Sequence, residues 1–266
     1  MAWTLDEKNV GFDGWRYTAL AIGVAVIILS VPISSLIRNR PEDYGLLPKG
    51  LVKNDIPSST EILNDAHDQG DYTWKQAIRT RAFWLISMGH ASTAAIVVTL
   101  MVHLGTMLTD RGFSLQTIGW VVATQTGVTA LFNLVGGYVG DKIPIRVALF
   151  VFSVIQTIGL IILLFAYTTP VVYIFAIVYG IGWGGRAPLT TAIRGVYFGR
   201  KAFASITGFS MIPMNILHLI APLFAGIMFD ITRSYTIPFS AIAVVSFIGS
   251  VLFLMLGNPQ KLTSTD

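Results

Sequence analysis

An arginine inside a long apolar stretch is the residue with the clearest chemistry in this chain. Arg186 lies in Val171–Ile193, where every other residue is uncharged. An arginine within the hydrocarbon region of a membrane is costly unless it faces protein or water and has a partner. The apolar stretches contain no Asp or Glu, so we expect the partner to be a carbonyl group, a residue of another chain or an anionic ligand.

Two interpretations fit such an arginine. Its planar guanidinium binds carboxylate and phosphate groups through paired hydrogen bonds, which favours a role as an anion anchor. The alternative is structural, because a long arginine side chain also extends toward the cytoplasmic surface or fixes a gate. We adopt the anchor as the prediction and keep the structural role as its alternative.

Polar side chains recur at helical spacing in three of the apolar stretches. The three stripes are Tyr179, Arg186 and Thr190; Gln125, Thr129 and Asn133; and Asn215 with His218. Residues three, four or seven apart share a helix face, and such stripes either line a cavity or join helices by hydrogen bonds. Next to an arginine without an acid they favour a cavity. We predict that Arg186 binds the carboxylate of an organic anion, with Tyr179, Thr190, Gln125, Asn133, Asn215 and His218 as further contacts.

The chain offers little for metal or cofactor chemistry. It has no cysteine, so thiolate ligands and nucleophiles are excluded. His90 and His103 are thirteen residues apart and fall on different helix faces, and no acid accompanies them or His218 in the apolar stretches. A histidine here either carries a proton near neutral pH or, as we favour, is neutral and bonds a neighbour. We predict no metal, no cofactor and no catalytic residue.

The composition requires a membrane. Of 266 residues, 53% are hydrophobic and 12% are charged, about half the charge of a soluble domain. Seven apolar stretches are each long enough to cross the hydrocarbon core as a helix: Tyr17–Ile37, Ala82–Leu108, Thr117–Val139, Val147–Tyr167, Val171–Ile193, Phe203–Phe229 and Thr236–Leu256. We predict an all-α polytopic protein with seven transmembrane helices, in contact with the lipid bilayer.

Basic residues in alternate loops predict the orientation. Thirteen Lys and Arg fall on one side, Arg194, Arg200 and Lys201 among them, and four fall on the other. The basic side is expected to be cytoplasmic, so the N-terminus lies outside and the C-terminus inside the cell inner or plasma membrane. Topology explains the net charge of +4, and we therefore expect no nucleic-acid partner.

Loop lengths divide the chain into five parts. We predict an outer segment 1–16, a single helix 17–37, a cytoplasmic loop 38–81, a six-helix bundle 82–257 and a cytoplasmic tail 258–266, because short connections make antiparallel neighbours. The end of the long loop, Thr73–Arg79, reads as a short interfacial helix with Thr73 as its N-cap and Trp74 at the level of the lipid headgroups.

The loop after the third stretch carries a spaced motif. Gly137-Tyr-Val-Gly-Asp141-Lys142-Ile-Pro-Ile-Arg146 resembles the signature of the major facilitator superfamily, Gly-x-x-x-Asp-Arg/Lys-x-Gly-x-Arg, with Pro144 in place of the second glycine. Gly14-Trp15-Arg16 resembles the start of the sixth helix of many members. Pro41–Gly50 and Tyr197–Lys201 followed by Gly208 resemble segments of the oxalate/formate-antiporter and monocarboxylate-porter branch.

The resemblance implies a fold and a function. The chain would be the C-terminal six-helix half of a twelve-helix transporter, preceded by one extra helix, with a missing N-terminal half as its partner. Gly137, Asp141, Lys142 and Arg146 would belong to the conformational switch at the cytoplasmic face. The solute site in such a fold lies between two rocking halves. We therefore expect a secondary transporter of a small solute, an organic anion such as a monocarboxylate or dicarboxylate.

Two other classes of membrane protein are alternatives to a transporter. A heptahelical receptor or retinal protein also has seven helices, but Thr236–Leu256 contains no lysine for a Schiff base and the connections are unusually short. A membrane enzyme is disfavoured because no acid, thiol or metal cluster lies within the apolar stretches.

Overall fold

The computed structural model describes residues 14–36 and 71–259, and every regular element in these ranges is an α-helix. The chain divides into two units, Met1–His67 and Asp68–Asp266. Most of the predicted outer segment 1–16, most of the loop 38–81 with its Pro41–Gly50 motif, and the tail after residue 259 lie outside the described residues.

The first unit contributes one described helix, α3, Gly14–Leu36. Its apolar side chains are exposed, with Leu20 at 68% and Ile28 at 64% of full exposure. The hydroxyl of Ser34 donates to the carbonyl of Val31 at 2.9 Å, which satisfies the polar group inside the helix itself. An apolar helix of this length is suited to a lipid environment, as the sequence predicts.

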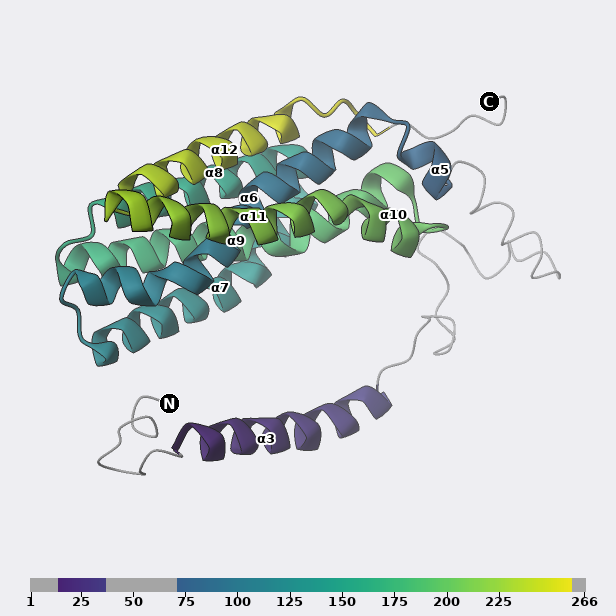
Figure 1. The fold of residues 1–266 in the computed structure, drawn as a ribbon. Helices are drawn as coiled ribbons and strands as arrows, with labels where there is room; N and C mark the ends of the chain where they lie inside the picture. The colour runs from purple at the N-terminus through teal and green to yellow at the C-terminus, as the bar shows by residue number, and fades with distance from the viewer. Residues whose placement is uncertain (1–13, 37–70, 260–266) are drawn as a thin grey trace. The chain divides into compact units, whose positions relative to one another are not determined.

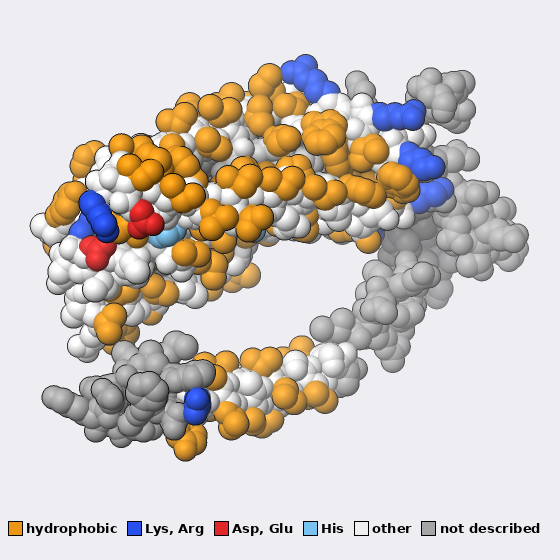
Figure 2. Space-filling view, in the orientation of Figure 1, with side chains coloured by type: hydrophobic (Ala, Val, Ile, Leu, Met, Phe, Trp, Pro, Cys, Tyr) orange, Lys and Arg blue, Asp and Glu red, His pale blue; other side chains and the backbone are white. Residues whose placement is uncertain are grey.

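The second unit is a bundle of long helices (Figure 1). Its elements are α5 (Trp74–Ala77), α6 (Arg81–Asp110), α7 (Leu115–Lys142), α8 (Ile145–Leu164), α9 (Thr169–Phe198), α10 (Phe203–Ser210), α11 (Ile212–Thr232) and α12 (Thr236–Leu254). The helix α9 packs mainly against α7 and α8, while α6 packs against α11 and α12 and α12 also packs against α8. Basic side chains gather at the ends of the bundle and apolar side chains cover the length between them (Figure 2).

The predicted polytopic helical class is confirmed. Within the described ranges, six helical stretches are long and apolar enough to cross a membrane: Arg16–Ser34, Arg81–Asp110, Leu115–Lys142, Ile145–Leu164, Phe203–Thr232 and Thr236–Leu254. The helix α9 is not among these six, although it has 30 residues. Its middle is rich in glycine and carries Arg186, which lowers its mean hydropathy below that of its neighbours. The predicted stretch Phe203–Phe229 is broken at Met211, between α10 and α11.

The short helix before the bundle forms as predicted. Thr73 is the N-cap of α5: its hydroxyl accepts from the backbone N–H of Gln76, and the Gln76 side chain accepts in return from the N–H of Thr73. This reciprocal pair satisfies two backbone donors of the first turn. Trp74 stacks on Phe209 of α10, with ring centroids 5.0 Å apart, so this contact fixes α5 to the bundle.

The interior of the bundle has two apolar clusters. One, at the end where α6 finishes, includes Leu104, Phe175 and Phe239, and the other, where α6 begins, includes Phe83, Phe152 and Phe253. Along α6, α8, α9 and α12, polar side chains lie between the residues that belong to the two clusters. Gln156, Arg186 and Ser246 are buried, and His90 is half-buried. We call this zone the polar layer. These polar side chains are the candidates for binding a solute in the interior of the bundle.

Glycine brings α9 close to α7 and α8. A Cβ atom on Gly136 of α7 would overlap the backbone of Gly185 in α9, and one on Gly182 of α9 would overlap the backbone of Gln156 in α8. Small residues at such crossings let helix backbones approach each other in membranes. The close approach places the polar side chains of α8 and α9 within hydrogen-bond reach.

An arginine fixes the far end of α8. Arg111, directly after α6, donates to the carbonyl oxygens of Leu163 at 2.7 Å, Leu164 at 3.1 Å and Ala166 at 3.0 Å. Its guanidinium carbon lies 4.4 Å from the ring centroid of Tyr167. Partial burial lowers the pKa of Arg111 below its ordinary value, yet the group remains a cation at neutral pH. A cation at the C-terminal carbonyls of a helix is stabilising.

Replacing Arg111 by methionine is expected to lower the free energy of unfolding by about 2 kcal/mol, because three carbonyls lose a charged donor. For a chain of this size that corresponds to a fall in melting temperature of roughly 5 °C, measured on the purified protein in detergent. Arg233→Met is the matched control, since Arg233 is exposed. An equal fall in both variants would contradict the capping role.

Candidate functional site

Arg186 is joined to the helix beside it by a side-chain amide. The guanidinium is 2% exposed, and its Nε donates to Oε1 of Gln156 in α8 at 2.9 Å. The Nε2 of Gln156 donates in turn to the Tyr179 hydroxyl through a long hydrogen bond of 3.5 Å. The structure therefore brings Arg186 and Tyr179 together, as predicted, through a residue that the sequence prediction left out.

Gln156 was missed because one amide in an apolar stretch has no stripe around it. It is the one amide side chain in Val147–Tyr167. A lone amide in an otherwise apolar stretch is itself a sign of a buried hydrogen bond, and this sign could have identified Gln156. The expected carbonyl partner of Arg186 is thus a side-chain carbonyl. An amide oxygen satisfies one donor of the guanidinium but does not neutralise its charge.

Several buried polar atoms in the described bundle have no hydrogen-bond partner. Among them are Nη1 of Arg186, Oε1 of Gln125 and Nε2 of His218. Buried polar atoms in folded proteins are almost always bonded, so each of these needs an explanation. All three belong to residues that the sequence predicts to contact a solute.

A second buried arginine lies in the same helix. Arg194 is 0% exposed; its Nε donates to Oγ of Ser210 at 2.9 Å and its Nη2 donates to Nδ1 of His90 at 2.8 Å. Its Nη1 donates to the carbonyl of Thr190. Arg194 therefore ties α9 to α6 and to the end of α10, directly before the break at Met211.

The prediction that Arg194 lies in a cytoplasmic loop is wrong. It follows the apolar stretch directly and is near Arg200 and Lys201, so hydropathy alone could not separate it from a loop residue, but α9 continues to Phe198. Removing Arg194 from the loop count leaves twelve basic residues against four (thirteen less one).

Two of the histidines, His90 and His103, bond neighbouring helices. His90 accepts from Arg194, and Nε2 of His103 lies 3.0 Å from the carbonyl oxygen of Pro222. Both contacts agree with the favoured interpretation of histidines that bond other helices.

The other predicted contacts lie in different surroundings. Thr190 is buried and its hydroxyl donates to the carbonyl of Ala187. In the second stripe Thr129 is buried, with its hydroxyl 3.5 Å from the Gly180 carbonyl, whereas Gln125 is half-buried. Asn133 and Asn215 are exposed, and His218 is half-buried. Thr129 and Thr190 therefore lie between packed helices, whereas Asn133 and Asn215 lie on the surfaces of α7 and α11.

The predicted switch motif lies at the turn between α7 and α8. Gly137 is half-buried, Asp141 and Lys142 are exposed, and Nζ of Lys142 lies 5.6 Å from the ring centroid of Tyr138. Arg146 donates from Nη1 to the carbonyl of Leu256, just after α12. In the part of the chain that the structure describes, Asp141 forms no ion pair with Lys142 or Arg146, and Arg146 ties this turn to the end of α12.

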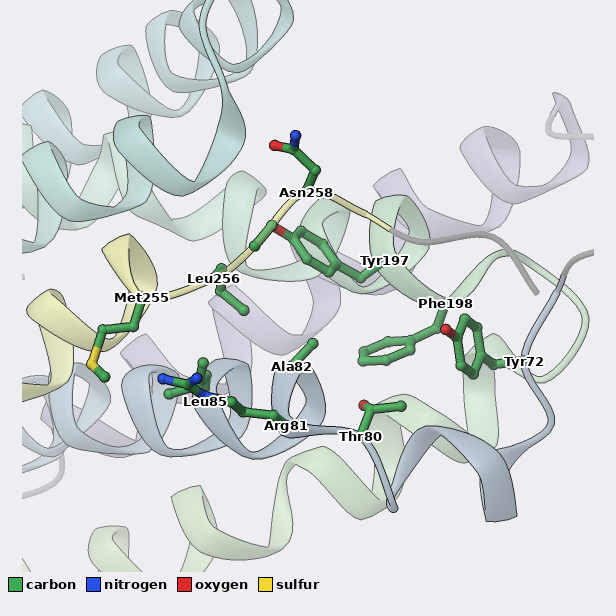
Figure 3. Close-up of a pocket in the computed structure, with 11 residues that line it drawn as sticks. Tyr72, Thr80, Arg81, Ala82, Leu85, Tyr197, Phe198, Met255, Leu256 and Asn258 are labelled. Carbon is green, nitrogen blue, oxygen red and sulfur yellow. The ribbon is translucent and has the colours of Figure 1, made fainter. Parts of the chain in front are cut away.

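A cavity opens at this end of the bundle, away from the polar layer. It has a volume of about 350 Å³ and lies between the start of α6 and the ends of α9 and α12 (Figure 3). Arg81, Thr80, Tyr197 and Asn258 line it. Tyr197 is eleven residues beyond Arg186, roughly 16 Å along α9 at ~1.5 Å per residue. The cavity is therefore separate from the Arg186 contacts.

Comparison with known proteins identifies the family. The family model described as Major Facilitator Superfamily matches residues 89–266. The protein named monocarboxylate transporter 11 from Homo sapiens is 28% identical over 196 residues, which cover 69% of this chain and 41% of that protein. Its counterpart from Mus musculus is 26% identical over 195 residues, covering 70% and 43%. The chain spans about two fifths of the length of these curated relatives. It belongs to the Major Facilitator Superfamily.

Proposed function

We propose that the six-helix bundle is one half of a secondary transporter that moves a small organic anion, a monocarboxylate or dicarboxylate, by alternating access. The observation that carries the proposal is Arg186, a buried cation whose Nη1 has no partner in the described bundle. Membership of a transporter superfamily supports transport over catalysis. The name of the two relatives supports the carboxylate class.

The charge distribution of the bundle favours a ligand from outside the chain. Residues 71–259 contain four acidic side chains, Asp71, Asp110, Asp141 and Asp230, and all four lie at or near helix ends. None is in the polar layer with Arg186, and none bonds Arg194. A desolvated cation is stable only when it is paired, and a carboxylate-bearing solute would supply the missing negative charge.

Two helix faces are suited to a second half. Along α7, Leu131 is 59% and Leu134 is 76% exposed, and along α11, Leu219 is 67% exposed. The polar side chains Asn133 and Asn215 are exposed on these same helices. We propose that a second six-helix half packs there and forms the other wall of the solute route, with the Gly137–Arg146 turn at the cytoplasmic face.

The proposal is tested by binding to the full chain in lipid nanodiscs, with radiolabelled pyruvate and oxalate as probes. Arg186→Gln is expected to weaken binding of the preferred probe by about 10- to 100-fold, because a hydrogen bond to a charged group contributes about 1.5–3 kcal/mol. Arg233→Gln, at an exposed site, is expected to bind like the unsubstituted chain. Undiminished affinity in Arg186→Gln, or no binding of either probe by the unsubstituted chain, would overturn the proposal.

A further inference from the structure

The contact between Arg194 and His90 fixes the protonation pattern of the imidazole. The guanidinium of Arg194 donates from Nη2 to Nδ1 of His90 at 2.8 Å. An arginine has no acceptor atom, so Nδ1 must present its lone pair. A neutral imidazole with a lone pair on Nδ1 carries its proton on Nε2. His90 is therefore a neutral donor through Nε2–H.

This donor has no protein acceptor in the part of the chain that the structure describes, because the Arg194 contact is the one side-chain hydrogen bond that His90 makes there. The charged and titratable groups near His90 are Arg186 and Arg194 from α9 and His218 from α11, all close enough to interact with it electrostatically. None is an acid. A second proton on His90 would break the Arg194 contact and add a third positive charge to this group.

Three nitrogen atoms without partners in the described bundle thus belong to His90 and to two side chains that interact with it electrostatically. They are Nε2 of His90 on α6, Nη1 of Arg186 on α9 and Nε2 of His218 on α11. The Nη1 of Arg186 and Nε2 of His218 are buried. A group that contains at least two donors and a positive charge matches a ligand with acceptor atoms and negative charge. A carboxylate has both, whereas a protonated acid keeps an acceptor oxygen but lacks the charge.

We propose that Nε2–H of His90 binds the carboxylate of the solute beside Arg186, and that Arg194 is a positioning residue that holds His90 in this tautomer. The inference rests on the proposed anion site and adds to it a residue from α6. The site then draws on α6, α9 and α11, so it selects the ionised form of the solute with donors from three helices.

Two variants of His90 separate binding from support of the fold. Asparagine places its amide oxygen near the position of Nδ1, where it still accepts from Arg194, but it has no atom at the position of Nε2. Glutamine reaches the position of Nε2 with an amide donor but leaves Arg194 without its acceptor. We expect His90→Asn to melt within 3 °C of the unsubstituted chain and to bind pyruvate or oxalate about 10-fold more weakly.

His90→Gln should show the opposite pattern, with a lower melting temperature and an affinity within about threefold of the unsubstituted chain. A purely structural role for His90 would reduce stability and affinity together in the same variant. If affinity follows the melting temperature across the two variants, the inference is overturned.

The positioning role is read directly from nitrogen NMR of the chain labelled at histidine, with His90→Asn to assign the resonance. We expect the Nε2–H tautomer of His90 in the unsubstituted chain, a mixture of tautomers in Arg194→Met, and recovery of the Nε2–H form in Arg194→Lys. An unchanged tautomer in Arg194→Met would remove the positioning role.

The outcomes distinguish this inference from the proposed function. If Arg186→Gln binds the probes normally, the anion site itself fails. If Arg186→Gln loses binding but His90→Asn keeps full affinity, the anion site stands and the role of His90 is overturned.

Discussion

Replacing Gly136 by valine is expected to destabilise the bundle strongly. A Cβ atom at this position overlaps the backbone of Gly185 across the α7–α9 contact, and a backbone atom cannot move away by changing rotamer. Overpacking in a well-packed interior costs about 1–3 kcal/mol and more where the backbone must shift. We expect a loss at the upper end of this range and a fall in melting temperature of roughly 10 °C.

Gly137 is a matched control one residue away. A Cβ atom on Gly137 meets nothing within 4 Å, so Gly137→Val changes helix propensity by the same amount without the clash. We expect its melting temperature to stay within a few degrees of the unsubstituted chain, as judged by size-exclusion profiles after heating. Similar losses in both variants would mean that the α7–α9 contact is looser than the structure shows.

Replacing Gln156 by leucine is expected to be the most destabilising change of a polar residue. Gln156 is 0% exposed and holds Nε of Arg186, so leucine leaves the guanidinium without its side-chain partner in α8. A buried donor left without its partner costs about 1–3 kcal/mol, and more when the group is charged. We expect a loss near 3 kcal/mol, and most of it should be recovered in Gln156→Leu/Arg186→Met, where both polar partners are gone.

Gln156→Glu tests the same contact by adding a negative charge instead of removing a hydrogen bond. It places a carboxylate within 3 Å or so of the Arg186 guanidinium and so supplies from the chain the charge that we assign to the solute. The melting temperature should rise and binding of pyruvate and oxalate should be lost. A variant that is both stabilised and fully able to bind would show that the solute does not use Arg186.

Much of the fold could be predicted because hydropathy and capping are local properties. The capping pair of Thr73 and Gln76 depends on residues three apart, and the long helices follow the apolar stretches. The break at Met211 was not predicted, although Pro213 two residues later is the kind of residue found in the first turn of a new helix. Ser210, directly before the break, bonds Arg194 of the preceding helix, and such a contact is not local in the sequence.

The candidate site was predicted in part. The stripe of Tyr179, Arg186 and Thr190 was found because a helix repeats its faces at regular intervals. Gln156 and His90 come from other helices, and which residues of different helices meet depends on the glycine contacts that set the distance between α8 and α9. A single sequence does not show how closely two helices approach each other where they cross.

The two buried arginines of α9 also bear on how the chain is made. The biosynthetic machinery releases each helix into lipid according to its own hydrophobicity, and an arginine near a helix centre opposes release by about 2.5–3.5 kcal/mol. Arg186 donates to Gln156 on α8 and Arg194 donates to His90 on α6, both translated before α9, while Ser210, another acceptor of Arg194, follows at the end of α10. Two of these three side-chain acceptors are therefore already present on earlier helices when α9 enters the bilayer.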